Sequence, residues 1–249
     1  MIASLSLLAI SLAAGVLLLW IFARTSDQAA LRITKKRLQA RLLEMRLYAD
    51  DPRVVLRAQR ALLTENLRYF ALMARPAAIA TVPMLLALIL LDGFYGRRPL
   101  EPGRSTIVTV GLGAPSAPPP AVLAASDGFR VETPPAHAVT EREISWRIRA
   151  ERAARGELRF EVGGEKAVLA VRSGGGLPLL GGRRSRSLAS WLLVPWEPRL
   201  ESSVIERIEV EYPSRQVSYF GLETHWLVWF MVFSMGGAFL LKNRFGVTL

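Results

Sequence analysis

The residues of this sequence that are suited to chemistry are few and scattered. His137 lies among prolines and His225 beside an apolar run, and neither has a nucleophile or a metal ligand at a typical spacing. The chain has no cysteine, which excludes disulfides, thiol catalysis and cysteine-ligated metals. The pair Asp50-Asp51 precedes Pro52, as in a helix start, and does not indicate paired catalytic acids. We therefore expect no enzymatic activity, no cofactor and no metal.

Three apolar runs are predicted to be transmembrane helices. Their expected bounds are 1–24, 69–92 and 224–242. A helix needs about 20 apolar residues to cross a bilayer, and the first run has no charged side chain before Arg24. This run also lacks the basic start of a cleaved signal peptide, so we expect it to remain as an anchor.

The positive charge of the chain is concentrated between the first two runs. Residues 24–75 carry twelve Lys/Arg and five Asp/Glu, whereas residues 92–223 carry 18 basic and 16 acidic side chains. Basic residues flanking a span favour the cytoplasmic side, so we place the N-terminus outside and the tail 243–249 inside. Charge beside spans does not indicate DNA binding. Arg outnumbers Lys 28 to 4, which is typical of GC-rich bacterial coding, and we expect the bacterial inner membrane.

Residues 25–68 are predicted to form a cytoplasmic hairpin of two helices. Apolar residues recur at intervals of 7, 4 and 3 in both arms, as Leu31, Leu38, Leu42 and Met45 and as Leu56, Leu63, Leu67 and Phe70. Asp50-Asp51-Pro52 lies between the arms and predicts a tight turn. Two such stripes predict an antiparallel coiled coil.

The outer surface of this hairpin is basic. Its expected docking residues are Lys36, Arg37, Arg41, Arg53 and Arg57. One interpretation is a solvated surface that sets the topology. The other is a docking surface for anionic lipid headgroups, ribosomal RNA or an acidic partner.

Residues 93–221 are predicted to form an exported domain of a different kind. Apolar residues alternate with polar ones, for example Ile144, Trp146 and Ile148, and Gly163-Gly164 predicts a two-residue hairpin turn. Short alternating strands of this kind predict an immunoglobulin-like β-sandwich of about seven strands. The fold class is thus an α+β membrane protein. The glycine-rich loop 174–182 is expected to be mobile, with an apolar tip.

The third apolar run carries two further signals. Trp226 and Trp229 at its outer end are typical of an aromatic belt at the membrane interface. Ser234, Gly236 and Gly237 form a patch of small residues, which allows another helix to approach closely. We expect this patch to pack against a helix.

Several short motifs resemble one family of membrane proteins. They are Leu38-Gln39-Ala40-Arg41-Leu42-Leu43-Glu44-Met45, Asp50-Asp51-Pro52, Ala58-Gln59-Arg60-Ala61-Leu62-Leu63, Arg75-Pro76 and Val82-Pro83-Met84. In this order they resemble the YidC/Oxa insertase superfamily, which includes the Get and EMC insertase subunits. The resemblance covers residues 1–95 and the placement of the third span.

The resemblance implies a non-enzymatic insertase with a hydrophilic groove that contains an arginine in the first core span. Residues 2–23 contain no arginine, so Arg24 or Arg75 would substitute for it. Asn66 and Thr81 would add polarity, and these four residues are the expected contacts with a client helix. The implied partners are membrane lipids, client helices of other membrane proteins, and the ribosome.

Two functions follow from these observations. The first is an insertase or a factor that assembles membrane complexes. The alternative is a structural subunit of an inner-membrane complex, whose β-sandwich binds an envelope partner and whose spans only anchor it.

Overall fold

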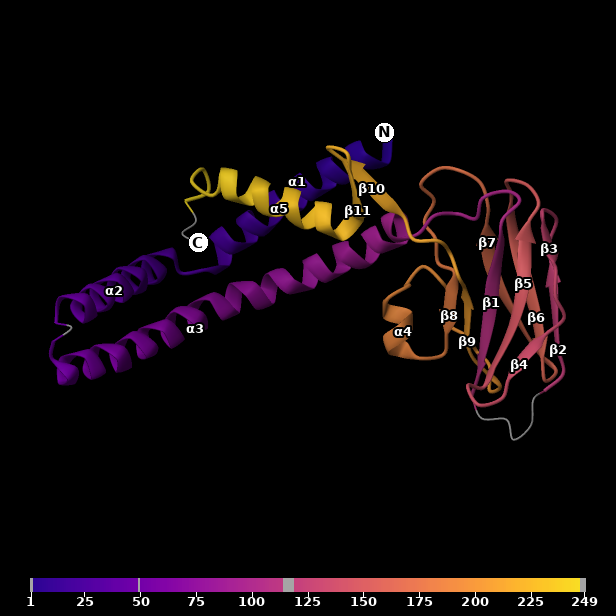
Figure 1. Ribbon diagram of the computed structural model, residues 1–249, viewed down its shortest axis with the longest axis horizontal. Helices are drawn as coiled ribbons and strands as arrows, with labels where there is room; N and C mark the ends of the chain where they lie inside the picture. Colours follow the sequence, from indigo (N-terminus) through magenta and orange to yellow (C-terminus); the bar gives the residue numbers. More distant parts are fainter. Residues whose placement is uncertain (1, 49, 114–118, 247–249) are drawn as a thin grey trace. The chain divides into compact units, whose positions relative to one another are not determined.

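The computed structural model describes residues 2–48, 50–113 and 119–246. The chain is an α+β protein that divides into two compact units (Figure 1). The helical unit consists of Met1–Ala87 and Val217–Leu249, and the β unit consists of Leu88–Gln216.

The helical unit contains four long helices and a small two-stranded sheet. Its elements are α1 (Ile2–Thr25), α2 (Gln28–Leu47), α3 (Pro52–Leu91), α5 (Trp226–Leu241), β10 (Gln216–Tyr219) and β11 (Leu222–His225). Asp27 caps α2, since its carboxylate accepts a hydrogen bond of 2.9 Å from the backbone N–H of Ala30. Asp51 caps α3 in the same way, through the N–H of Arg53 at 2.9 Å. The predicted restart of the helix at Pro52 is confirmed.

Two of these helices are long and apolar enough to cross a membrane. They are α1, over Ala3–Thr25, and α3, over Arg53–Gly96. Pro76 and Pro83 lie inside α3 without ending it. The third expected span, α5, has only 16 residues, and at 1.5 Å per residue it is about 24 Å long.

The coiled-coil packing predicted for 25–68 is not shown by the described residues. In α2 the expected stripe turns inward only in part, because Leu31 is buried and Leu38 partly buried but Leu42 is 55% exposed. In α3 the expected stripe lies outside, because Leu56, Leu63, Leu67 and Phe70 are 53, 61, 70 and 64% exposed. The inward face of α3 instead contains Ala58, which is buried, and Glu65, which forms an ion pair of 3.5 Å with Arg37 of α2. The small alanine and the ion pair thus occupy the place expected for leucines.

The β unit contains two antiparallel sheets. The larger has the order β3-β5-β1-β9-β8, with β4 also paired to β5, and the smaller has the order β2-β6-β7. The strands of the larger sheet are β1 (Ser105–Leu112), β3 (Phe129–Val131), β4 (Ala136–Ala138), β5 (Glu143–Ala150), β8 (Arg183–Ser185) and β9 (Ile205–Val210). Those of the smaller are β2 (Ala121–Ala125), β6 (Arg155–Val162) and β7 (Glu165–Arg172). A short helix, α4 (Leu188–Leu192), and a π-helical turn, η1 (Asp92–Gly96), complete the unit.

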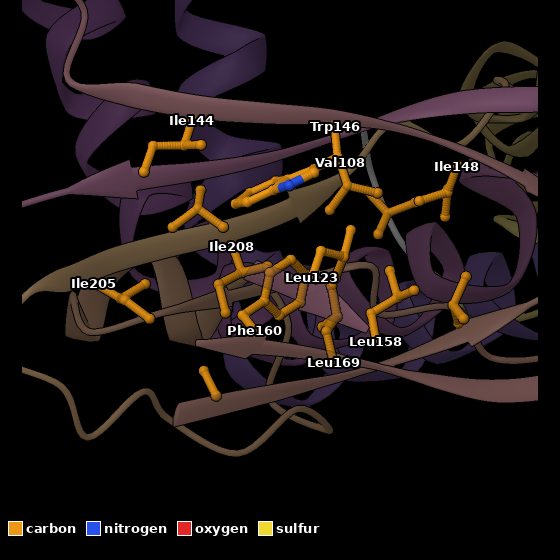
Figure 2. Close-up of a cluster of buried hydrophobic side chains, with 14 of the residues drawn as sticks. Val108, Leu123, Ile144, Trp146, Ile148, Leu158, Phe160, Leu169, Ile205 and Ile208 are labelled. Carbon is orange, nitrogen blue, oxygen red and sulfur yellow. The ribbon is translucent and has the colours of Figure 1, made fainter. Parts of the chain in front are cut away.

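The hydrophobic core of the β unit lies between the two sheets (Figure 2). Alternate residues of each strand point into it, as the period of two predicts. Trp146 of β5 meets Phe160 of β6 edge to face, with the ring centres 6.0 Å apart. The predicted turn at Gly163-Gly164 joins β6 to β7, and both glycines have positive φ, at 60° and 83°. Inward-facing strand residues from both sheets therefore stabilise this unit.

Candidate functional site

The closest helix contact of the helical unit is a seam between α1 and α5. A Cβ atom at Gly15 would lie 2.4 Å from the backbone oxygen of Ser234, so only glycine fits at this position. A Cβ at Gly237 would lie 2.9 Å from Leu12 Cδ2. Ser11 of α1 is fully buried, and its hydroxyl donates to the backbone oxygen of Leu7. Small residues thus bring the two helices together, as in many membrane helix pairs.

Only part of the predicted packing patch of Ser234, Gly236 and Gly237 lies in this seam. Ser234 and Gly237 lie against α1, whereas a Cβ at Gly236 would meet no atom within 4 Å. The small residues on the α1 side of the seam, Ser11 and Gly15, were not predicted from the sequence. Their signal was present as two small residues four positions apart inside an apolar run.

An aromatic cluster joins the β10–β11 hairpin to these helices. The ring of Tyr219 lies 4.9 Å from that of Trp229 and 4.8 Å from that of Phe233. The indole N–H of Trp229 donates to the backbone oxygen of Val217 at 3.1 Å, and the Tyr219 hydroxyl donates to the backbone oxygen of Ser4. The hairpin is therefore tied to the N-terminal ends of both α1 and α5.

Helix α3 has an exposed apolar surface, as do the outward faces of α1 and α5, where Leu17 is 48% and Met235 is 64% exposed. Its apolar residues Ile79, Val82, Leu85 and Leu86 are 44, 62, 53 and 58% exposed. Within the described residues α3 shares no close seam with α1 or α5. Its apolar surface is thus open to lipid or to another helix.

The structure does not bring the four expected groove residues together. Arg24, Asn66, Arg75 and Thr81 are all exposed. Asn66 and Arg75 are nine residues apart on one continuous helix, which at 3.6 residues per turn places them on opposite faces. The Arg24 guanidinium lies 5.9 Å from the centre of the Trp20 ring, and the Thr81 hydroxyl donates to the backbone oxygen of Ala77 at 2.8 Å. Arg24 and Thr81 thus contact residues of their own helices and not each other.

The expected docking residues of the hairpin are all exposed, but among the described residues only two of them form ion pairs. Arg37 pairs with Glu65 across the arms, and Arg41 pairs with Glu44 at 2.7 Å within α2. Lys36, Arg53 and Arg57 form no ion pair within the described part of the chain. On α3, Arg53 and Arg57 lie three and one positions from Leu56, and at 100° per residue both are on the same side of the exposed leucine stripe. This face is both apolar and basic.

Comparison of the chain with protein-family models, with curated proteins and with solved structures finds no match.

The β unit carries a polar cleft of about 690 Å³ at one end of β1. Three arginines line it, Arg98, Arg104 and Arg147, together with Glu101 and Glu211. Arg104 lies 3.7 Å from Glu101, and both side chains are well exposed. Among the described residues, no group of three His, Asp or Glu side chains is placed to hold a metal ion. The lining thus has a small excess of positive charge, since two glutamates and several apolar side chains lie beside the three arginines.

The apolar tip of the loop 174–182 is only partly exposed, at Leu177 and Leu179. Leu180 is buried, and its N–H donates to the backbone oxygen of Gly93 at 2.9 Å. A Cβ at Gly93 would lie within 2.6 Å of both Leu179 and Trp196, so these side chains cover the π-helical turn closely. The burial of Leu180 was not expected, because its packing partner lies more than 80 residues away in the sequence, and the expected mobility of the loop stays a prediction.

Proposed function

We propose that this protein is an insertase-like factor that helps other membrane proteins to insert or assemble, by holding an apolar helix against α3. The main support is that α3 has no close helix partner among the described residues, although its apolar side chains are no more exposed than the outward ones of α1 and α5. Gly15 and Ser234 join α1 and α5 closely, whereas Val82 and Leu86 of α3 remain exposed. A client helix would cover this apolar surface in place of lipid.

The cytoplasmic part of α3 would make the first contact with the client. Its exposed face combines Leu63 and Leu67 with the arginines at 53 and 57. An apolar helix with an acidic flank would bind there through apolar burial and charge attraction. The groove mechanism implied by the insertase resemblance is not part of this proposal, because Asn66 and Arg75 lie on opposite faces of α3.

Single cysteines can test the proposal, because the chain has none of its own. The V82C variant should crosslink to a cysteine in the apolar helix of a nascent client, since Val82 is 62% exposed. A80C is the matched control, because Ala80 lies on the same helix and is 7% exposed. Equal crosslinking at the two positions would refute contact along α3.

We further infer that the protein lies in a bacterial inner membrane, with its N-terminus outside, the α2–α3 turn in the cytoplasm and an immunoglobulin-like β unit outside. In intact spheroplasts, a membrane-impermeant maleimide should label K166C of the β unit and spare D51C of the turn. Labelling of D51C without permeabilisation would contradict this orientation.

The second candidate function is that of a structural subunit whose β unit binds an anionic envelope partner. The cleft with Arg98, Arg104 and Arg147 favours it. Purification in mild detergent distinguishes the two functions. One partner at fixed stoichiometry, lost when the three arginines are changed to alanine, supports the subunit, and varied transient clients support the insertase.

A further inference from the structure

We infer that the tip of the β10–β11 hairpin, formed by Phe220 and Leu222, inserts into the outer interface of the lipid bilayer beside the short helix α5. The inference rests on the proposed membrane crossing and orientation of α1 and α5, and it does not involve clients. It assigns lipid binding to two apolar side chains that are not buried inside the protein.

The backbone of the tip has an unusual conformation for its sequence. Phe220 and Gly221 connect β10 to β11 and have positive φ, at 54° and 81°. A two-residue turn with positive φ at both positions favours Asn-Gly, because a side chain with a Cβ is strained there. Phenylalanine is a poor choice for this turn. Backbone strain of this kind persists where the side chain serves another purpose.

The exposure of the tip is the second argument. Phe220 is 88% exposed, and the neighbouring Leu222 is 62% exposed. The Phe220 ring lies 6.2 Å from the Trp229 ring centre, so it extends the aromatic cluster outward without being buried by it. The turn therefore presents an apolar surface that the protein itself leaves uncovered.

The attachment of the hairpin fixes where this surface lies. A two-stranded hairpin of this length is not stable alone. Here Tyr219 is bound to Ser4 of α1, and Trp229 of α5 is bound to Val217. The tip is thus held at the N-terminal ends of both helices, which is the outer end in the proposed orientation.

The length of α5 is the third argument. Its 16 residues extend about 24 Å, which is about 6 Å less than the hydrocarbon core of a bilayer. Apolar groups beside its N-terminus would reduce this mismatch. Phe220 and Leu222 are such groups.

The hairpin also has the polarity of an interfacial element. Ser218 and Glu223 are exposed, whereas Val217 and Tyr219 face the helices. A carboxylate such as that of Glu223 is tolerated among headgroups but not in the hydrocarbon core. We therefore place the hairpin at the level of the headgroups, with only its tip among the acyl chains.

The test measures the depth of a probe at the tip. A fluorophore on L222C, with Phe220 retained, is studied in phosphatidylcholine vesicles whose lipids carry a shallow or a deep doxyl quencher. Shallow quencher should reduce its emission strongly, and aqueous iodide should have little effect. The same probe on K166C in the β unit should show the reverse.

The F220N substitution separates anchoring from folding. Asparagine suits the turn, so the thermal unfolding of the full chain in detergent should be unchanged or shifted upward. The probe on L222C should nevertheless lose its doxyl quenching and become accessible to iodide. These two outcomes together support the inference.

Two results would overturn it. The first is free access of iodide to the L222C probe with Phe220 present, which would place the tip in water. The second is protection from iodide without doxyl quenching, which would mean that protein covers the tip, either a second copy or a partner. Either result leaves the crosslinking prediction for Val82 untouched.

Discussion

The sharpest prediction concerns Gly15, where α1 meets the backbone of α5. In the G15A variant the new methyl group would lie 2.4 Å from the Ser234 carbonyl oxygen, while ordinary contacts of a Cβ begin near 3.4 Å. Backbone cannot rotate away as a side chain can, so the helices must separate locally by about 1 Å. The contacts along the seam would weaken accordingly.

The expected magnitude follows from two opposing effects. Overpacking in a tight contact costs about 1–3 kcal/mol. Replacing glycine by alanine inside a helix contributes about 1 kcal/mol in the opposite direction. We expect G15A to lower the free energy of unfolding by about 0–2 kcal/mol, from the difference between these effects.

Two glycines of α5 provide matched controls. G236A should stabilise the protein by about 1 kcal/mol, because a methyl group there meets no atom within 4 Å. G237A should fall between the two, because its methyl group meets the end of the Leu12 side chain, which can shift. Equilibrium unfolding in micelles with a rising fraction of sodium dodecyl sulphate measures all three. If G15A proved as stable as G236A, the close approach of α1 and α5 would be refuted.

Three further predictions concern single side chains. The R37A substitution should lower the free energy of unfolding by only about 0.2–1 kcal/mol, because the ion pair of Arg37 with Glu65 is half exposed. A double-mutant cycle with E65A measures the coupling energy of this pair. Burial raises the pKa of the Glu197 carboxyl above its usual 4.5. Because the folded β unit then keeps this proton to a higher pH than the unfolded chain does, its free energy of unfolding should fall as the pH rises above 4.5. In E197Q this loss should be absent from thermal unfolding between pH 4 and 7, and an unchanged pH dependence would contradict it. W146A should destabilise the β unit by about 3–5 kcal/mol in chemical denaturation, and W146F far less, because the core is tightly packed around this ring.

The strands and turns of this protein were accessible from local pattern. The alternation through Ile144 and Trp146 predicted β5 and its buried face, and Asp51 before Pro52 predicted the start of α3. These signals depend on neighbours in the sequence, so they survive without knowledge of the tertiary fold.

Contacts between distant segments were less accessible. The leucines at 56 and 63 matched a heptad stripe, yet the pairing of Arg37 with Glu65 and the small side chain of Ala58 turn a different face of α3 inward. A periodic stripe shows that a face is apolar and does not show which element covers it. The α1 half of the seam at Gly15 was overlooked for a related reason, because the run containing it was interpreted only for its length.

The expected groove stays a prediction, but one pair of its residues is separated by the helix geometry. Asn66 and Arg75 point in opposite directions once residues 52–91 form one unbroken helix. What the sequence left open was whether Pro76 interrupts that helix, since proline often does. In the structure the helix continues through it.

The continuity of α3 has a mechanical consequence. Its 40 residues form a helix about 60 Å long that begins after the Asp50-Asp51 turn and continues through the apolar stretch (Figure 1). Torque applied where Arg53 and Arg57 meet a ligand would be transmitted along the helix, turning Val82 and Leu86 relative to their surroundings. Pro76 and Pro83 lie along this length, and each removes one backbone hydrogen bond from the helix. In the proposed orientation, a ligand bound near Arg53 would thus act on the same continuous helix that carries Val82 and Leu86.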